Sequence, residues 1–196
     1  MTICAHNQYQ TILADPPYYY AHRMSGTGMR FGGGASAHYP LMQDAEILAM
    51  ADFVDSLADK PCALCLWATC PRLDFAIEVI RAWGFRYVTV LFHWVKTDRV
   101  GLPIFGPGSY TASNLELLLL GRRGKLRRER QMMESLVMHP RLEHSRKPPI
   151  VRDRIVQVLG DVPRIELFAR ERTDGWDAWG DEIGKFDQSA QVRMGL

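Results

Sequence analysis

Long hydrophobic runs are missing from this sequence of 196 residues. The longest, at residues 62–68 and 117–120, are far shorter than the roughly 20 apolar residues of a membrane-spanning helix. The first six residues lack a charged segment followed by an apolar one, so we expect no signal peptide and a cytoplasmic protein. With 47% hydrophobic and 23% charged residues, the composition favours one globular domain over residues 1–186 and a polar tail at 187–196.

Cysteine is also scarce, and the chain contains only Cys4, Cys62, Cys65 and Cys70. Cys62 and Cys65 form a C-x-x-C, a spacing found in zinc and redox sites. They lie in an apolar stretch typical of a buried strand, in which residues three apart face opposite sides of the sheet. No second C-x-x-C or H-x-x-x-H completes a metal site. We therefore expect core cysteines and no metal.

A large net charge is absent as well, because the formal charge is +2. Its distribution is uneven: residues 121–154 contain eleven Lys or Arg and four Asp or Glu, a local charge of +7, and the remainder carries −5. Such a segment is typical of an edge that binds a polyanion, although a solvated loop has the same composition.

The most informative stretch is the motif Asp15-Pro16-Pro17-Tyr18, which follows the apolar residues 12–14. A strand cannot continue through two prolines, because neither offers an N–H to the ladder. The prolines also stiffen the backbone, so Asp15 and Tyr18 should project from a rigid elbow at a strand end. Ligands of open α/β sheets bind outside the carboxyl ends of strands. An ordinary strand-terminating turn is the alternative, but the motif is rare enough to favour a function.

Hydrophobic periodicity predicts strands near residues 11–14, 62–68, 87–95, 115–120 and 164–168, helices near 44–58, 71–84 and 148–160, and a short final element at 176–180. No crossover helix separates the third and fourth strands, so we expect them to pair antiparallel. The chain is then an α/β sheet with a hairpin near one edge. Five glycines within residues 25–39 predict a mobile loop, either a lid beside the elbow or a plain surface loop.

At this point the residues resemble a known family. Asp15-Pro16-Pro17-Tyr18 is similar to the Asp-Pro-Pro-aromatic signature of amino-group methyltransferases that use S-adenosylmethionine. Downstream, His144-Ser145-Arg146-Lys147-Pro148-Pro149 and Ile165-Glu166-Leu167-Phe168-Ala169-Arg170 resemble the cofactor half of that group. A catalytic motif that precedes the cofactor motif is the permuted order of the METTL-type adenine methyltransferases, the MT-A family. Further matches are Leu66-Trp67-Ala68, Trp94-Val95-Lys96-Thr97 and residues 176–183.

The resemblance implies a Rossmann-like methyltransferase sheet, mostly parallel, with helices on both faces. It also implies methyl transfer to the N-6 amine of adenine in nucleic acid. Asp15 would accept one amine hydrogen and the Pro16 carbonyl the other, which frees the nitrogen lone pair for attack. Pro17 would stiffen the elbow, and Tyr18 would offer a flat face to the extruded base.

The resemblance further implies which residues bind S-adenosylmethionine. It also implies that the reaction uses no metal. Lys147 matches a lysine near the cofactor's carboxylate, and Glu166 matches an acid for the ribose hydroxyls. Relatives carry Asn-Gln or Asn-Glu in the terminal motif, where this chain has Asp181-Glu182. Asp cannot donate a hydrogen bond as Asn does. The predicted cofactor site comprises Asp15, Lys147, Glu166, Phe168, Arg170, Asp181 and Glu182.

The substrate polymer is predicted less sharply. Tyr18 stands where many RNA-modifying relatives carry Trp, which favours DNA over RNA. The predicted nucleic-acid contacts are Tyr39, Arg122, Arg123, Lys125, Arg127, Arg128 and Arg130. The sequence does not decide whether the protein forms a homo-oligomer or a hetero-oligomer. A catalytically silent paralogue that only binds nucleic acid is the alternative, although such subunits usually lose the acid or the lysine, and this chain has both Asp15 and Lys147.

Overall fold

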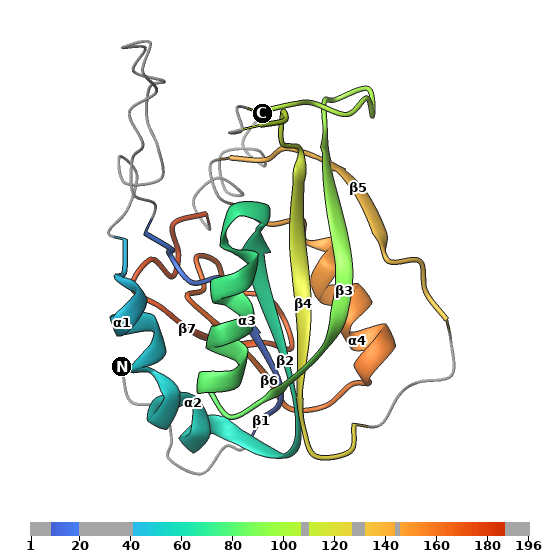
Figure 1. The fold of residues 1–196 in the computed structure, drawn as a ribbon. Helices are drawn as coiled ribbons and strands as arrows, with labels where there is room; N and C mark the ends of the chain where they lie inside the picture. Colours follow the sequence, from blue (N-terminus) through green and yellow to red (C-terminus); the bar gives the residue numbers. More distant parts are fainter. Residues whose placement is uncertain (1–8, 20–40, 107–109, 127–131, 144–145, 187–196) are drawn as a thin grey trace.

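The computed structural model describes residues 9–19, 41–106, 110–126, 132–143 and 146–186, which form a seven-stranded sheet in the order β5-β3-β4-β2-β1-β6-β7 (Figure 1). The strands are β1 (Tyr9–Ala14), β2 (Ala58–Thr69), β3 (Arg86–Thr97), β4 (Leu115–Arg123), β5 (Leu136–Pro140), β6 (Arg164–Leu167) and β7 (Asp177–Trp179). The helices are α1 (Asp44–Leu48), α2 (Ala51–Leu57), α3 (Leu73–Ala82) and α4 (Ile150–Leu159).

Strand β4 runs against the rest of the sheet. β1 pairs parallel with β2 and β6, β6 with β7, and β3 with β5, whereas β4 is antiparallel to both β2 and β3. This confirms the predicted sheet, mostly parallel with an antiparallel hairpin near one edge. The hairpin lies one strand inside that edge, because β5, which the sequence analysis missed, forms the edge itself.

Helices cover both faces of the sheet, as predicted, and each face has its own core. Phe75, Ala76, Val79 and Ile80 of α3 pack in one buried cluster, and Val151, Ile155 and Leu159 of α4 pack in the other. The side chains of β2 alternate between the two clusters. Apolar burial on both faces explains why β2 is almost continuously hydrophobic.

Cys62 and Cys65 fall in different clusters, so the prediction that they face opposite sides of the sheet is confirmed. Both thiols are free and buried, and burial raises the pKa of Cys62 to about 12. Within the described ranges, no group of three His, Cys, Asp or Glu side chains is arranged to hold a metal ion. Cys4 lies outside the described residues.

Helix positions match the sequence analysis with one correction. The single helix predicted near residues 44–58 is two helices, α1 and α2, and the N-cap of α1 is Gln43. α4 begins directly after Pro149 and ends at Gly160, where φ is 94°. No helix in the described part of the chain is long and apolar enough to cross a membrane. The predicted lid and the predicted C-terminal tail lie outside the described residues.

Strand direction decides which residues share an edge of the sheet. Six strands, β1, β2, β3, β5, β6 and β7, end on the same side of the sheet, and β4 begins there because it runs in reverse. We call this row of strand ends the catalytic edge, as distinct from the outer strands β5 and β7. β1 lies between β2 and β6, so Asp15 emerges near the middle of this edge.

Candidate active site

The elbow after β1 is fixed by its own backbone. The Tyr18 N–H donates to the Pro16 carbonyl at 2.8 Å, and the Met42 N–H donates to the Pro17 carbonyl at 2.9 Å. The Tyr18 side chain is 5% exposed, and its hydroxyl donates to the Trp67 carbonyl at 2.8 Å. Asp15 is half-buried and projects from a turn tied to two neighbouring segments. The stacking of a base on Tyr18 stays a prediction.

Lys147 contacts Asp15 although 132 positions separate them in the sequence. Its Nζ lies 2.7 Å from Asp15 Oδ2 and 3.2 Å from Glu116 Oε2, and 5.5 Å from the centre of the Trp67 ring. Lys147 stands three residues before α4, whose buried face sets the position of this segment against the sheet. The fold therefore joins the first and the last motif of the sequence at one ion pair.

Glu116 links this pair to a fourth charge. Its Oε1 lies 2.6 Å from Lys96 Nζ, so Lys96, Glu116, Lys147 and Asp15 alternate in sign. Burial alone would raise the pKa of Glu116, but the two ammonium groups outweigh burial and hold its pKa below the ordinary value. Burial alone would lower the pKa of Lys147, yet the two carboxylates raise it above the ordinary value. Glu116 and Lys147 are therefore both charged at neutral pH.

Glu166 is buried in β6 and has the partner that a buried acid requires. Arg152 of α4 binds it in a bidentate manner, with Nε at 2.7 Å from Oε2 and Nη2 at 3.0 Å from Oε1. The same guanidinium reaches Glu171 at 2.9 Å, and Glu171 also accepts from Arg146 at 2.6 Å. Burial raises the pKa of Glu166 despite Arg152. This network holds α4, and with it Lys147, against the end of β6.

A cavity of about 320 Å³ lies beside Asp15 at the catalytic edge. It is lined by Asp15, Pro17, Met42, Phe168, Arg170, Trp179, Gly180, Asp181 and Glu182. The lining combines a flat ring pair, Phe168 edge-on to Trp179 at 5.6 Å, with a cation and several acids. Arg170 Nε lies 3.0 Å from Glu182 Oε2. A second, narrower cavity beside it also borders Lys147 and Glu166.

Phe168 enters this cavity from a strained backbone. Its φ is 61°, the left-handed region that side chains other than glycine rarely adopt. A strained backbone conformation persists only when the surrounding structure imposes it, and such residues cluster at ligand sites. Here the turn ends β6 and directs the following residues, through Arg170, along the cavity wall.

The predicted nucleic-acid contacts that the structure describes lie away from this site. Tyr39, Arg127, Arg128 and Arg130 fall outside the described residues. Arg122, Arg123 and Lys125 are described, and they lie at the end of β4, opposite the catalytic edge. Cys62 at the start of the core of β2 pairs with Arg123, whereas Thr69 at its end pairs with Glu116.

Arg123 is also occupied within the protein. It lies 2.8 Å from Asp55, donates to the Trp83 carbonyl at 3.0 Å, and covers the Phe85 ring at 4.7 Å. Its side chain is 11% exposed. Any contact with a polyanion at this end of β4 would therefore come from its neighbours.

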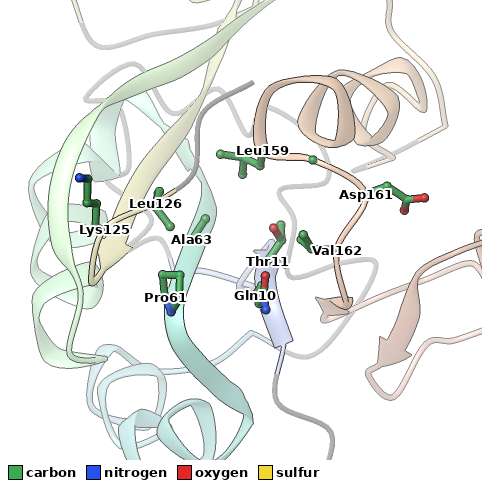
Figure 2. A pocket seen from close by; sticks show the side chains of 10 residues that line it. Gln10, Thr11, Pro61, Ala63, Lys125, Leu126, Leu159, Asp161 and Val162 are labelled. Carbon is green, nitrogen blue, oxygen red and sulfur yellow. The ribbon is translucent and has the colours of Figure 1, made fainter. Parts of the chain in front are cut away.

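A separate cavity of about 260 Å³ lies at this opposite edge (Figure 2). The start of β1, the start of β2, and the segments after β4 and α4 surround it, and Figure 2 shows Lys125 and Asp161 on different sides. These two carry the only charges among the described residues that line it. The cavity does not border Asp15 and is separate from the site at the catalytic edge.

The residues of the candidate site that the sequence analysis did not identify include Lys96, Glu116 and Arg152. Glu116 offered one signal, an acid inside the otherwise apolar run of β4. Lys96 was part of a matching motif but without an assigned role. Arg152 offered no signal, because an arginine within a helix is ordinarily exposed.

The fold and the site together define a class of protein. The sheet is mostly parallel, has one reversed strand and is covered by helices on both faces, and the motif Asp15-Pro16-Pro17 lies beside a cavity. These features are typical of a Rossmann-like methyltransferase. The chain belongs to the MT-A70 family, whose model matches residues 9–182.

Named relatives agree with this placement. The chain is 35% identical over 191 residues to the Type II methyltransferase M.MunI of Mycoplasma sp. The aligned region covers 90% of the chain and 78% of that protein. It is 40% identical over 110 residues to the N6-methyladenosine RNA methyltransferase MTA1 of Cryphonectria parasitica, covering 54% of the chain and 31% of MTA1. It is 29% identical over 147 residues to the human N(6)-adenine-specific methyltransferase METTL4, covering 68% of the chain and 31% of METTL4. The chain thus spans most of the first relative and about a third of the other two.

Proposed function

We propose that this protein transfers a methyl group from S-adenosylmethionine to the exocyclic N-6 amine of adenine in nucleic acid, with DNA as the favoured substrate. The observation that carries the proposal is the 2.7 Å contact between Lys147 and Asp15 beside the cavity. Two motifs 132 positions apart meet at one edge of the sheet, where an adenine and a methyl donor can lie side by side. Relatives named as N6-adenine methyltransferases support the same reaction.

The elbow supplies the groups that the amine needs. Lys147 binds Asp15 Oδ2 and leaves Oδ1 to accept one hydrogen of the amine. The Pro16 carbonyl accepts one bond, from Tyr18, and a carbonyl has a second lone pair for the other hydrogen. Two acceptors held by rigid backbone draw the nitrogen toward a tetrahedral shape and free its lone pair. Placing this nitrogen in line with the methyl group accounts for most of the remaining barrier.

The lining of the cavity fits S-adenosylmethionine, which supplies an electrophilic methyl group when bound. Arg170, together with Lys147 of the adjacent narrower cavity, can bind its carboxylate. Asp181 and Glu182 can accept from its ribose hydroxyls, and the rings of Phe168 and Trp179 can pack on its adenine. Glu166 is assigned to the ribose as well, by resemblance. Its bidentate bond with Arg152 also gives it a second role, because it orients the segment that carries Lys147.

The test is transfer of a labelled methyl group to three substrates of matched sequence: single-stranded DNA, duplex DNA and RNA. We expect incorporation into DNA and a loss of at least about 1000-fold with Asp15→Ala, which removes the amine acceptor. A matched control is Asp161→Ala, which removes an exposed acid at the opposite edge. Identification of the product as N6-methyladenine by mass spectrometry fixes the atom that is methylated.

The same experiment decides between the alternatives. Preferred incorporation into RNA would make the protein an RNA methyltransferase, a reading that the name of MTA1 supports. No incorporation into any substrate, with S-adenosylmethionine binding or nucleic-acid binding retained, would identify a silent paralogue. Incorporation that survives Asp15→Ala would overturn the proposed mechanism.

A further inference from the structure

The connection between β3 and β4 exposes a group of large apolar side chains at the catalytic edge. The exposed fractions of its described members are 80% for Val100, 64% for Leu102, 69% for Phe105 and 101% for Tyr110. Soluble proteins tolerate single exposed apolar residues, but a group of them on one segment marks an interaction site. The question is which partner this segment fits.

Hydrogen bonds order the described residues of this segment, so the exposure of its side chains does not result from fraying of the backbone. Asp98 Oδ1 accepts from the N–H groups of Val100 and Leu102, each at 2.9 Å. Ile104 N–H donates to the Lys96 carbonyl at 2.9 Å, and Gly106 and Ser113 exchange two backbone bonds of 2.7 and 3.0 Å. These bonds hold both arms of the connection while the rings of Phe105 and Tyr110 stay in solvent.

The segment is joined at its base to the row of alternating charges formed by Lys96, Glu116, Lys147 and Asp15. The ion pair of Lys96 with Glu116 joins its two arms at the base, and Lys147 connects Glu116 to Asp15. Phe105 follows Ile104, whose N–H is bonded to Lys96 itself. The exposed rings and the catalytic carboxylate are therefore presented at the same edge by directly connected residues.

Two exposed cations lie near the root of the segment that carries these rings. Arg99 lies exposed between β3 and the ring-bearing segment. Arg141 is exposed as well, and its N–H donates to the Thr97 carbonyl at 3.1 Å, which places it beside the root of the segment. Aromatic faces next to arginines are the combination with which proteins bind unpaired nucleic-acid bases and their phosphates.

We propose that Phe105 and Tyr110 form a stacking surface for the bases that flank the target adenine, while Arg99 and Arg141 contact the adjoining phosphates. This inference rests on the proposed function and adds the contact surface of its substrate. An adenine that leaves its stack to reach Asp15 exposes the faces of its neighbours, and flat rings can cover those faces whatever their sequence. Phe105 and Tyr110 are positioning residues for the substrate and take no part in the chemistry.

The test compares three variants by fluorescence anisotropy with a labelled single-stranded DNA of about 12 nucleotides that contains one adenine. Phe105→Leu/Tyr110→Leu keeps apolar bulk and removes the planar rings, so the loss of base stacking should lower the affinity roughly tenfold, which is about 1.4 kcal/mol. Phe105→Tyr/Tyr110→Phe keeps both rings and should bind within about twofold of the parent protein. Met132→Ala is the control, because Met132 is 92% exposed and precedes β5 at the opposite edge.

Each outcome decides the inference. Equal affinity of the Leu double variant and the parent protein would overturn it. A dimer of the parent protein that light scattering finds dissociated in the Leu double variant, with DNA affinity kept, would make this surface an interface between copies of the chain. If the parent protein methylates no nucleic acid, the proposed function fails, and the binding measurements then test the stacking surface separately.

Discussion

Lys96, Glu116, Lys147 and Asp15 form a row of alternating charges at the residue scale, and the row explains how a carboxylate is held in a mostly buried place. Ions removed from water are costly unless each has close partners. Each of the two inner groups, Glu116 and Lys147, has two partners of opposite sign. Loss of one inner member leaves charges without compensation, so the row should respond as a unit.

Glu116→Gln should lower kcat about tenfold or more while the KM for S-adenosylmethionine changes less. The variant removes one of the two carboxylates that hold Lys147, so Lys147 and Asp15 are less strictly positioned for the amine. Steady-state methyl transfer measures both constants. Glu134→Gln, which changes an exposed acid at the opposite edge, is the control. An unchanged kcat would show that Glu116 serves only the fold.

The same substitution should change the pH dependence of stability. The pKa of Glu116 is below its ordinary value in the folded protein, so the unfolded chain takes up this proton first as the pH falls. Its stabilisation is complete above about pH 4.3 and is lost as the pH falls through the folded pKa. Urea unfolding between about pH 6 and 3 should therefore give a shallower acid loss for Glu116→Gln. Parallel curves would contradict this assignment.

Asp15 and Lys147 could be predicted because each lies in a motif read directly from the chain, whereas their neighbours could not. Glu116 reaches Lys96 only because Trp94 pairs with Glu116 across the antiparallel ladder. That register depends on two irregularities in β3, which no local pattern encodes. The motif residues were therefore predicted from sequence, and the residues that hold them in place required the fold.

At the scale of elements, long strands and helices were predicted and short ones were not. β5 has five residues, and its apolar run, Leu136-Val137-Met138, is too short to predict a strand. The break between α1 and α2 lies within a stretch whose apolar residues keep helical spacing, so periodicity did not reveal it. Backbone direction at a two-residue break is set by packing on the sheet, which the sequence does not display.

The contact between β4 and α3 depends on a residue without a side chain. A Cβ on Gly121 would lie 2.8 Å from Ile80 Cγ2 and 3.2 Å from Phe85 Cβ. Gly121→Ala should therefore lower the free energy of unfolding by about 1–3 kcal/mol, because α3 must move off the strand. Thermal or urea unfolding measures this. Gly106→Ala, whose Cβ would meet only Ser113 O at 3.4 Å, should change stability little. Equal losses in both variants would contradict the packing argument.

On the scale of the whole molecule, the basic segment crosses from one edge of the sheet to the other. Arg122 and Lys125 lie opposite the catalytic edge, and β5 returns the chain to that edge, where Arg141 and Lys147 follow. The sequence showed the charge of this segment but not its direction. About seven residues of β2 separate the two ends, roughly 23 Å at 3.3 Å per residue.

This separation predicts an effect of substrate length. Neutralising Arg122 and Lys125 should weaken the binding of a DNA of about 30 nucleotides and flatten its salt dependence, since fewer counterions are released. A DNA of about four nucleotides around the adenine should bind as before, because it cannot span both edges. Anisotropy titrations at several salt concentrations measure both. Unchanged binding of the long DNA would show that the segment is only a solvated surface.

The place of β1 in the sheet has a consequence for how the protein is made. β1 pairs with β2 on one side and with β6, about 150 residues later, on the other. During synthesis this central strand keeps an open edge until residues 164–167 have emerged. Pairings between such distant segments form slowly, and an open strand edge recruits other chains. Lys147 is carried by the segment before α4, which Arg152 joins to β6, so we expect its contact with Asp15 to form only when β6 has joined the sheet.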